Sequence, residues 1–420
     1  MKTALLSAFL LIFSGALFGQ AFVANYDEAK MPAYTLPDPL LFNNEQPVKD
    51  AVGWTKRRAE ILELFENEVY GKTPTGKVHL AFRVISENRE ALEGMAIQRE
   101  VQLTLEKDGN TLLINVLLYL PKAGKKHPLF LGLNFSGNHT ISDDPGIAIT
   151  NSWVRNNAAK GITANKSVES TRGSDSASWP VRALIERGYG LATIYCGDLD
   201  PDFDDGFKNG VHSLFPGPRS SNSWGTVAGW AWGLSRVLDY LEKVKEVDAK
   251  RVVVLGHSRL GKAALWAGAN DPRFAIVVSN ESGCGGAALS KRIFGETVER
   301  INTSFPHWFC ENFRKYNRKE EDLPVDQHEL LALIAPRPLY VCSAEEDQWS
   351  DPKGEFLACA AASPVYKLLG KEGLPGKEFP DLQQPLTGTI GYHIRSGKHA
   401  INLYDWTSFL NFSDIYFAKR

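Results

Sequence analysis

The sequence contains few cysteines, five among 420 residues, and it has no low-complexity block. An odd number leaves at least one thiol unpaired, and the spacing matches no zinc-binding pattern. One or two disulfide bonds are compatible with the sequence, which cannot by itself pair Cys196, Cys284, Cys310, Cys342 and Cys359. Because no ligand pattern is present, we expect neither a metal ion nor another cofactor.

The sequence also lacks a marked excess of positive or negative residues, because its formal net charge is −2. We therefore do not expect a basic surface that would bind nucleic acid or an anionic membrane. Beyond the N-terminal residues, no segment is long and apolar enough to cross a bilayer. We expect a monomer with neither nucleic acid nor membrane as a partner.

The N-terminus has the features of a secretory signal peptide. Lys2 supplies a positive charge, and residues 4–18 form an apolar stretch that is too short for a comfortable membrane span. Gly19-Gln20-Ala21 offers small residues at the positions that a signal peptidase requires. We predict a signal peptide over residues 1–21 and a secreted mature chain, extracellular or periplasmic, that begins near Phe22.

One stretch predicts a nucleophile. Residues 251–255, four of them aliphatic, run into Gly256-His257-Ser258, and an alanine-rich helical segment follows at once. A serine in a sharp turn between strand and helix is held in a strained conformation that exposes its hydroxyl. Leu260 occupies the second glycine position of the common Gly-x-Ser-x-Gly motif, and Gly261 follows one residue later. A serine that only caps the helix is the alternative, but the apolar strand and the helix favour a nucleophile at Ser258.

The order of predicted elements changes along the chain. An N-terminal helix at 54–70 precedes strands at 78–85, 96–105 and 111–120, and Asp108-Gly109-Asn110 is a typical hairpin turn between the last two. From residue 127 onward strands and helices alternate. Further strands are predicted at 128–135, 190–196, 251–255, 274–279, 338–343 and 390–395, with helices at 178–187, 226–244, 263–269, 352–369 and 402–417.

An antiparallel hairpin followed by repeated strand–helix units, with a serine elbow in the middle, predicts an α/β-hydrolase fold. This fold is a three-layer sandwich with a mostly parallel central sheet. We expect residues 22–420 to form a single catalytic domain. The stretches 136–177, 197–225 and 283–336 are too long for plain connections and are expected to build the rim of a cleft.

A serine nucleophile needs a general base, because its own hydroxyl pKa lies far above neutrality. In this fold the base follows the last strand, where His399 lies in Ser396-Gly397-Lys398-His399-Ala400. His393 falls within the predicted strand, where a packed and hydrogen-bonded imidazole is expected. We therefore predict His399 as the base.

Two carboxylates compete to orient the base. Asp347 follows the strand at 338–343, the usual position of the acid in α/β-hydrolases, and Glu281 follows the strand after the elbow. Two carboxylates beside one imidazole repel each other, so either one is partly protonated or a nearby cation offsets it. From the residues alone, both candidates stay open.

Three motifs together resemble the glucuronoyl esterases of carbohydrate esterase family 15, especially the bacterial members. They are Gly256-His257-Ser258-Arg259-Leu260-Gly261-Lys262, Glu281-Ser282-Gly283-Cys284-Gly285-Gly286 and Gly397-Lys398-His399. The resemblance runs over most of the mature chain. Fungal members have a disulfide bond between the positions that His257 and Ala400 occupy here, so that bond is absent.

The resemblance implies further site residues. It makes Glu281 the principal acid and Asp347 a helper, as in some bacterial members. It also gives Glu296 contacts with the hydroxyls of the sugar ring and places Trp349 over the sugar. Nothing in the spacing of these residues would have indicated the last two roles.

Chemistry assigns roles to two residues after the nucleophile. Arg259 places a backbone N–H, and with it a guanidinium, near a developing oxyanion, where each preorganised donor lowers the barrier by roughly 3 kcal/mol. Lys262, at i+4 from Ser258, shares a helix face with it and can reach substrate hydroxyls, although a solvated lysine is more common at such a position.

The sequence thus predicts a secreted serine esterase that hydrolyses 4-O-methyl-glucuronoyl esters linking glucuronoxylan to lignin alcohols. An acetyl-xylan esterase or another carbohydrate esterase on the same fold is the alternative, and it would leave Lys262, Glu296 and Trp349 without a role. A carbohydrate-binding protein that has lost catalysis is disfavoured, because the serine, the histidine and both acids are present.

Overall fold

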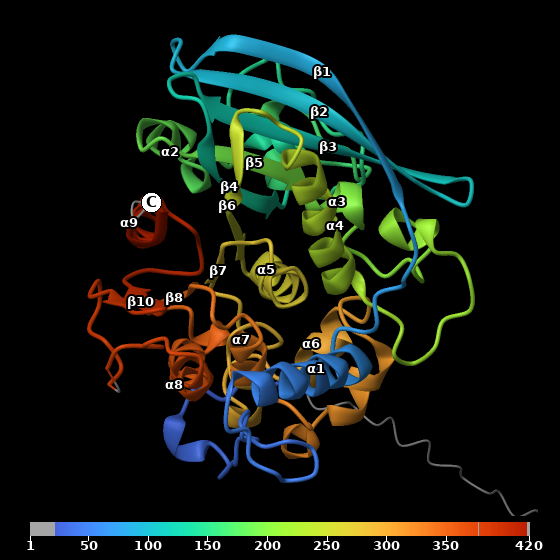
Figure 1. Cartoon of the computed structure of the whole chain (residues 1–420). Coiled ribbons are helices and arrows are strands. Elements are labelled where there is room, and N and C mark those ends of the chain that lie inside the picture. Colours follow the sequence, from blue (N-terminus) through green and yellow to red (C-terminus); the bar gives the residue numbers. More distant parts are fainter. Residues whose placement is uncertain (1–21, 377, 418–420) are drawn as a thin grey trace, which may run out of the picture.

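The computed structural model describes residues 22–376 and 378–417, so the predicted signal peptide lies outside the described residues. Within this part, ten strands form one sheet in the order β1-β2-β3-β5-β4-β6-β7-β8-β10-β9 (Figure 1). The strands are β1 (His79–Ala91), β2 (Ala96–Lys107), β3 (Asn110–Pro121), β4 (His127–Asn134), β5 (Gly190–Tyr195), β6 (Val247–His257), β7 (Ile276–Asn280), β8 (Leu339–Ala344), β9 (Leu386–Thr387) and β10 (Ile390–Arg395). The helices are α1 (Ala51–Glu68), α2 (Val181–Glu186), α3 (Cys196–Leu199), α4 (Thr226–Leu241), α5 (Arg259–Asn270), α6 (Val298–Ser304), α7 (Gln327–Ala332), α8 (Pro352–Leu368) and α9 (Leu403–Phe417).

The sheet is parallel in its centre and antiparallel at its edges. Strands β5, β4, β6, β7, β8 and β10 are parallel neighbours, whereas β1, β2 and β3 form an antiparallel meander that joins β5. Asp108 and Gly109, with φ of 50° and 83°, make the tight turn between β2 and β3. The prediction of an α/β-hydrolase fold with an antiparallel N-terminal part is confirmed.

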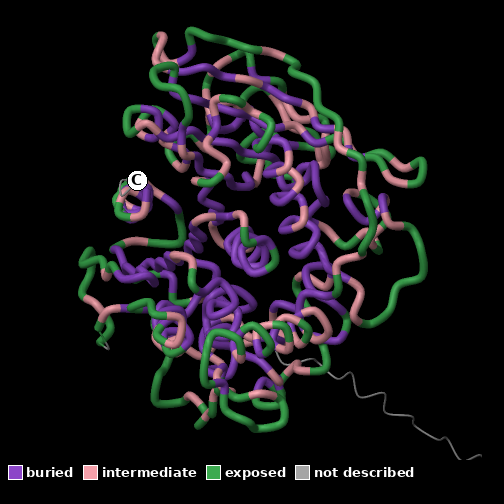
Figure 2. Tube along the Cα trace, viewed as in Figure 1, coloured by how far each residue is buried: buried purple, intermediate pink, exposed green. Residues whose placement is uncertain are grey.

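The side chains of the central strands belong alternately to two separate hydrophobic cores, because successive side chains of a strand point to opposite faces. In β6, Val252 and Val254 belong to the larger core, and Val253 and Leu255 belong to the smaller one. Helices α4, α5 and α8 cover the first face, and α2 and α9 cover the second (Figure 1). In Figure 2, α5 is buried in the centre while β1 is exposed at the outer edge. These are the three layers that the sequence predicts.

The structure differs from the sequence-based expectations mainly in the connections. Strand β1 continues to Ala91, and β6 begins at Val247. The helices α3, α6 and α7 and the short strand β9 were not predicted, because two to seven residues show too little periodicity to be recognised. All five cysteines are buried free thiols, so the described residues contain no disulfide bond.

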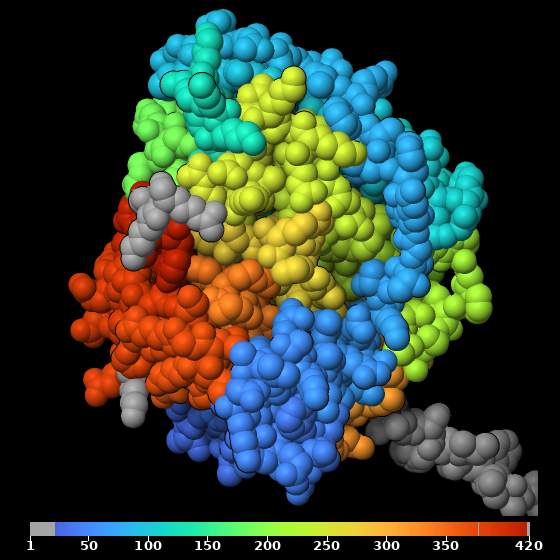
Figure 3. Space-filling view, viewed as in Figure 1, coloured from blue at the N-terminus to red at the C-terminus, as the bar shows by residue number. Residues whose placement is uncertain are grey.

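The N-terminal segment packs against the later part of the chain. Figure 3 shows the blue N-terminal residues in contact with the orange and red C-terminal part. Arg57 of α1 pairs with Glu329 of α7 at 3.1 Å, and Glu28 pairs with Arg292 at 2.6 Å. Among the helices of the described residues, none combines the length and apolar character needed to span a membrane.

The predicted rim insertions come together above the sheet. Arg155 of the first insertion donates a hydrogen bond to the carbonyl of Asp202 in the second, at 2.7 Å. His307 and Trp308 of the third insertion contact the carboxylate of the same aspartate. Three segments far apart in the sequence are therefore connected through one buried residue.

Candidate active site

Ser258 occupies a strained turn between β6 and α5. Its φ of 56° and ψ of −131° lie outside the regions that ordinary residues favour, and its N–H donates to the carbonyl of Asn280 at 2.8 Å. A Cβ at Gly256 would lie 2.0 Å from the carbonyl oxygen of Leu260, and one at Gly261 would lie 3.0 Å from that of Gly256. The two glycines therefore allow the close approach of strand and helix, which explains why the second glycine stands at 261 rather than at 260.

His399 lies in the loop after β10 and meets both predicted acids. Its Nδ1 is 2.6 Å from Asp347 Oδ2 and 3.1 Å from Glu281 Oε2. Because both carboxylates meet Nδ1, Nε2 is the nitrogen left for Ser258. Ser258 and His399 line one cavity of 370 Å³.

The two acids differ in their surroundings. Burial raises the pKa of Glu281 to about 7, although His399 and Arg395 favour its anion. Arg395 donates to Glu281 at 2.6 Å and also pairs with the buried Asp405. For Asp347, burial is outweighed by the hydrogen bond to His399, and the pKa of the carboxyl lies below its usual range. The shorter contact and the lowered pKa thus belong to Asp347, which the resemblance ranks second.

The charge of the base follows from these contacts. Burial disfavours the imidazolium, but the hydrogen bonds and charges of Asp347 and Glu281 outweigh burial and raise the pKa of His399 to about 9. Besides His399, Glu281 has a second cationic partner, Arg395, and among the described residues no arginine or lysine pairs with Asp347. The arrangement therefore favours the imidazolium of His399, the form that the predicted base would take after removing a proton from Ser258.

Two further histidines near the site, His393 and His257, have different partners. His393 is fully buried, and its ring nitrogens lie 3.0 Å from Asp405 and 2.9 Å from the Tyr340 hydroxyl. It is therefore a packed residue, as expected. The His257 imidazole lies against that of His399, with ring centroids 4.5 Å apart, and its Nδ1 is hydrogen-bonded to Asn280.

The residues expected to contact the sugar form a second group. Lys262 donates to the carbonyls of Ser282 and Cys284, both at 2.6 Å, and its Nζ lies 3.7 Å from Glu296. Two of its three N–H groups are thus used within the protein, which leaves one for a ligand. Glu296 in turn donates its backbone N–H to the carbonyl of Trp349 at 3.0 Å. Burial raises the pKa of the Glu296 carboxyl.

Arg259 begins α5, so its backbone N–H lies in the first helical turn, where N–H groups have no helical acceptor. Its guanidinium lies 4.5 Å from the ring centroid of Phe135, and its Nε is 2.9 Å from Asp202 Oδ2. The ion pair uses Nε, and neither Nη group donates a hydrogen bond to the described residues. Both groups remain available for an oxyanion.

Two clusters bring three potential metal ligands within 4.8 Å of one another. They are His257, Glu281 and His399, and Cys342, His393 and Asp405. In each cluster the imidazoles and carboxylates already have hydrogen-bond partners in the protein, described above. We therefore assign no metal to either cluster.

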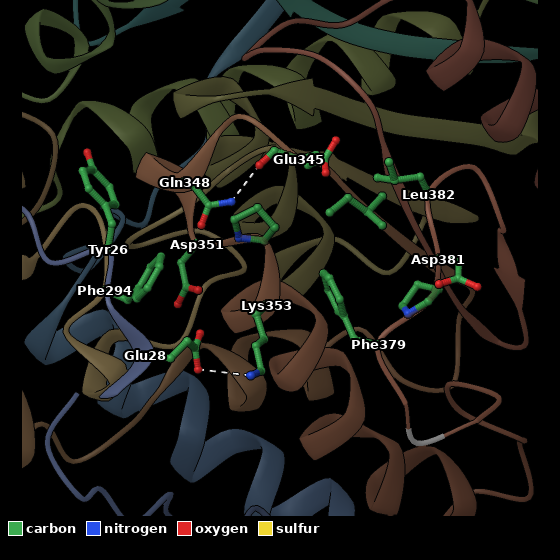
Figure 4. Close-up of a pocket in the computed structure, with 13 residues that line it drawn as sticks. Tyr26, Glu28, Phe294, Glu345, Gln348, Asp351, Lys353, Phe379, Asp381 and Leu382 are labelled. Carbon is green, nitrogen blue, oxygen red and sulfur yellow. Dashed lines mark hydrogen bonds and ion pairs between the residues drawn. The ribbon is translucent and has the colours of Figure 1, made fainter. Parts of the chain in front are cut away.

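Another cavity, of 380 Å³, lies beyond the turn that carries Asp347. Tyr26, Phe294 and Phe379 contribute aromatic side chains to its wall (Figure 4). Glu28 and Lys353 of its lining form an ion pair, with 3.1 Å between Nζ and Oε2 (Figure 4). It contains none of the predicted site residues, so it is separate from the catalytic centre.

Comparisons with known proteins agree with this geometry. A carbohydrate esterase from an unknown prokaryotic organism is 50% identical over 93% of this chain and 91% of its own length. The chain belongs to the glucuronoyl esterases of carbohydrate esterase family 15. A family model described as glucuronyl esterase, fungi, matches residues 208–370, which include Ser258 and both acids but end before His399.

Solved structures place the chain with the bacterial members of the family. A promiscuous esterase of family 15 from a marine bacterial metagenome is 50% identical, has a TM-score of 0.88, and covers 93% of this chain and 99% of its own. The glucuronoyl esterase from Solibacter usitatus is 49% identical, has a TM-score of 0.86, and covers 93% and 100%. The resemblance stated from the sequence motifs is confirmed.

The structure of this esterase also reveals supporting residues that sequence reasoning missed. Glu355 of α8 is buried and accepts hydrogen bonds from the N–H groups of Ser282 and Gly283, at 2.8 and 3.0 Å. Burial raises the pKa of its carboxyl to about 8. Glu355 holds the segment directly after Glu281, and no local signal distinguishes it from other helical glutamates.

Asp202 is the second missed residue. It is buried, its Oδ1 accepts hydrogen bonds from Trp308 Nε1 at 2.8 Å and meets His307 Nε2 at 3.0 Å, and its Oδ2 pairs with Arg259. Burial opposes its charge, but His307, Arg259 and Trp308 lower the pKa of Asp202 to about 2. Trp308 and His307 hold one carboxylate oxygen of Asp202, and the other oxygen pairs with Arg259. Asp202 therefore fixes the position of the Arg259 guanidinium beside Ser258.

The contributions of Asp347 and Glu281 to catalysis can be separated by isosteric substitutions. We expect Asp347→Asn to lower kcat/KM by roughly 100-fold and Glu281→Gln by roughly tenfold, with the double variant near the loss of about 10⁴-fold expected for His399→Ala. This order follows from the shorter contact of Asp347 and reverses the ranking implied by the resemblance. A double variant no worse than either single variant would show that the acids do not share one role.

The same variants test the pH dependence. A base with a pKa of about 9 is protonated below that value, so wild-type kcat/KM should rise with pH into the alkaline range. Removing either negative charge destabilises the imidazolium, so the rise should move to lower pH in Asp347→Asn and Glu281→Gln. A rise at unchanged pH in both variants would contradict the shared contact.

The role of Asp202 in positioning the Arg259 guanidinium can be tested by substitution. We expect Asp202→Asn to lower kcat by roughly tenfold or more with little change in KM, because the guanidinium is no longer held for the oxyanion. Asp200→Asn is the matched control, since Asp200 is buried in the same loop but contacts Thr226 and His212. In an Arg259→Ala background the effect of Asp202→Asn should largely disappear; full additivity would mean that Asp202 acts elsewhere.

Proposed function

We propose that this esterase hydrolyses the ester bond between 4-O-methyl-glucuronoyl groups of glucuronoxylan and lignin alcohols. The observation that carries the proposal is the nucleophile elbow at Ser258 beside His399 and its two carboxylates, with the polar group of Lys262, Glu296 and Trp349 next to it. Relatives from Podospora anserina and Cerrena unicolor are named 4-O-methyl-glucuronoyl methylesterase. Each is 29% identical to this chain, over 80% and 83% of it and over 61% and 64% of their own length.

The first half of the reaction forms an acyl-enzyme. His399 Nε2 removes the proton of the Ser258 hydroxyl while Oγ attacks the ester carbonyl. The carbonyl electrons move to the oxygen, which the backbone N–H and the guanidinium of Arg259 stabilise. The tetrahedral intermediate then collapses, the bond to the alcohol oxygen breaks, and that oxygen takes the proton from His399.

The second half releases the acid. Water replaces the alcohol, His399 takes one of its protons, and the hydroxide attacks the acyl carbon. The same oxyanion donors act again, and the tetrahedral intermediate collapses with breakage of the bond from the acyl carbon to Ser258 Oγ, which takes the proton from His399. Asp347 and Glu281 hold the imidazole through Nδ1 in both halves, so Nε2 always faces the reacting atoms.

Substrate selection depends on the polar group. Lys262 has one N–H left for a sugar hydroxyl, the Glu296 carboxylate accepts hydrogen bonds from hydroxyls, and the Trp349 indole offers a face for the ring. Glu296 and Lys262 are held 3.7 Å apart, so a ligand hydroxyl between them could contact both.

Several features of the whole protein belong to the same proposal. We propose that residues 22–420 act as one secreted catalytic domain, because one sheet contains strands from His79 to Arg395 and the N-terminus has the features of a signal peptide. Secretion suits a substrate that belongs to the plant cell wall.

A second activity has one observation in its favour. The bacterial structure at 50% identity is described as a promiscuous esterase. Acetyl esters of carbohydrates need the serine, the base and the oxyanion donors but no sugar-carboxyl contacts. We therefore include acetyl-xylan or related esters as a second candidate substrate class.

The catalytic assignment is tested by removing the nucleophile and the base. Ser258→Ala and His399→Ala should each reduce the hydrolysis of benzyl glucuronoate by about 10⁴-fold or more without unfolding the protein, since the residues act as a unit. His393→Gln should retain catalysis at some cost in thermal stability. Near wild-type activity of Ser258→Ala would show that the elbow serine is not the nucleophile.

Specificity is tested with paired substrates. Lys262→Ala and Glu296→Ala should lower kcat/KM for benzyl glucuronoate at least tenfold more than for 4-nitrophenyl acetate, because unpaired buried polar groups discriminate strongly. The physical reason is that the hydroxyl contacts exist only for the sugar. Equal losses on both substrates would mean that Lys262 and Glu296 support the fold instead.

A further inference from the structure

The first described residues of the chain lie against a residue that is proposed to contact the sugar. The Phe22 ring meets the Trp349 indole edge to face, with 6.0 Å between the ring centroids. The guanidinium of Arg300 lies 5.4 Å from the centroid of the same Phe22 ring. Residues 22–28, which we call the N-terminal strap, therefore reach the sugar site directly.

The backbone of the strap also approaches Glu296. The N–H of Gly295 donates a hydrogen bond to the carbonyl of Asn25 at 2.9 Å, and the N–H of Glu296 donates to the carbonyl of Trp349 at 3.0 Å. Gly295 has a φ of 64°, and a Cβ there would lie 2.4 Å from the Trp349 carbonyl oxygen. Two successive N–H groups thus connect this segment to the strap and to the turn that carries Trp349.

One buried guanidinium joins the strap to both segments that carry sugar contacts. Arg292 pairs with Glu28 at 2.6 Å and, through Nε, with Asp351 at 2.8 Å. In the sequence it precedes Glu296 by four residues, and Asp351 follows Trp349 by two. Because Arg292 is buried, loss of either partner would leave its charge incompletely compensated.

The strap is held by these contacts rather than by secondary structure. Residues 22–26 belong to no helix or strand, and Val23 and Tyr26 are 85% and 53% exposed. Tyr26 packs edge to face against Phe294, with 6.1 Å between the ring centroids (Figure 4). The strap therefore keeps its position only through its contacts with the segment at 292–296 and with the Trp349 turn.

The residues that the strap contacts need such support. Glu296 and Trp349 lie outside the strands and α-helices of the fold. Side chains on loops are placed less precisely than those on strands or helices, unless neighbouring residues hold them. Lys262, the third residue of the polar group, lies on the buried helix α5 and does not depend on the strap in this way.

We propose that the N-terminal strap is a positioning element, which holds Trp349 and Glu296 in the geometry that binds the sugar ring. The proposal rests on the proposed function, since it concerns the same sugar contacts. Phe22 acts on Trp349 through its ring, and Glu28 acts on both segments through Arg292. No strap residue lines the cavity at Ser258, so the strap affects binding of the sugar and not the attack on the ester.

The main test removes the Phe22 ring from the mature protein, residues 22–420. We expect Phe22→Ala to raise KM for benzyl glucuronoate about fivefold and to change kcat less than about twofold, because the edge-to-face contact positions the indole for binding. The kcat/KM for 4-nitrophenyl acetate, which has no sugar, should change less than about twofold. Phe22→Tyr keeps the ring and should restore the wild-type KM.

Neighbouring residues supply matched controls. Val23→Ala changes the next, exposed side chain and should leave both substrates within about twofold of the wild type. Glu28→Ala removes the pair with Arg292 and should raise KM for benzyl glucuronoate about threefold. Asp27→Ala should not raise KM, because Asp27 pairs with Lys30 and not with Arg292.

A double-mutant cycle separates positioning of Trp349 from a general contribution to stability. If Phe22 acts through the indole, Phe22→Ala should change KM for benzyl glucuronoate less than about twofold in a Trp349→Ala background. A side chain that only stabilises the fold would instead lower the melting temperature and reduce activity on both substrates alike. The melting temperature of every variant is measured for this comparison.

The outcomes distinguish the two proposals. Unchanged kinetics in Phe22→Ala, equal losses on both substrates, or an undiminished effect without the indole would each overturn the role of the strap. In all three cases the wild type still hydrolyses benzyl glucuronoate, so the proposed function stands. If the wild type hydrolyses 4-nitrophenyl acetate but not benzyl glucuronoate, the proposed function fails and the role of the strap fails with it.

Discussion

The close approach of β6 to α5 is the constraint on which the rest of the site depends. The carbonyl of Leu260 leaves no room for a side chain at Gly256, and the chain reaches the helix only by placing Ser258 at a positive φ. Such a conformation costs of order 1–3 kcal/mol and persists because the surrounding structure determines it. Here the buried α5 on one side and the hydrogen bond to Asn280 on the other hold the turn.

Around this elbow, buried charged side chains form ion pairs with specific partners of opposite charge. Glu281, Arg395 and Asp405 form a buried chain behind His399, while Asp347 approaches the imidazole from the turn after β8. Arg395 offsets part of the repulsion between the two carboxylates, because it pairs with Glu281 at 2.6 Å. Burial still raises the pKa of the Glu281 carboxyl to about 7, and without Arg395 this carboxyl would be driven further toward its protonated form.

The rim insertions determine what the catalytic residues can reach. They meet at Asp202, which holds Arg259, and the third insertion also carries Glu296 beside Lys262. The predicted nucleophile, base and acids instead follow strands β6, β7, β8 and β10 of the sheet. The position of the Arg259 guanidinium and the pairing of Glu296 with Lys262 therefore depend on the loops, and loops are the segments that vary most freely on a common fold.

The sequence by itself determined the fold class and the turn that carries Ser258, and it predicted that His399, Glu281 and Asp347 belong to one site, where the structure brings them together. The reason is that these features are local: apolar runs of strand length, a Gly-x-Ser turn before a helix, and polar residues directly after strands. Only the tertiary structure decided how the acids share the imidazole, because the strength of each contact depends on distance and on Arg395, which lies 114 positions from Glu281. The roles of Asp202 and Glu355 likewise needed the folded chain, since a buried carboxylate in a loop or helix has no pattern of its own until its partners are brought to it.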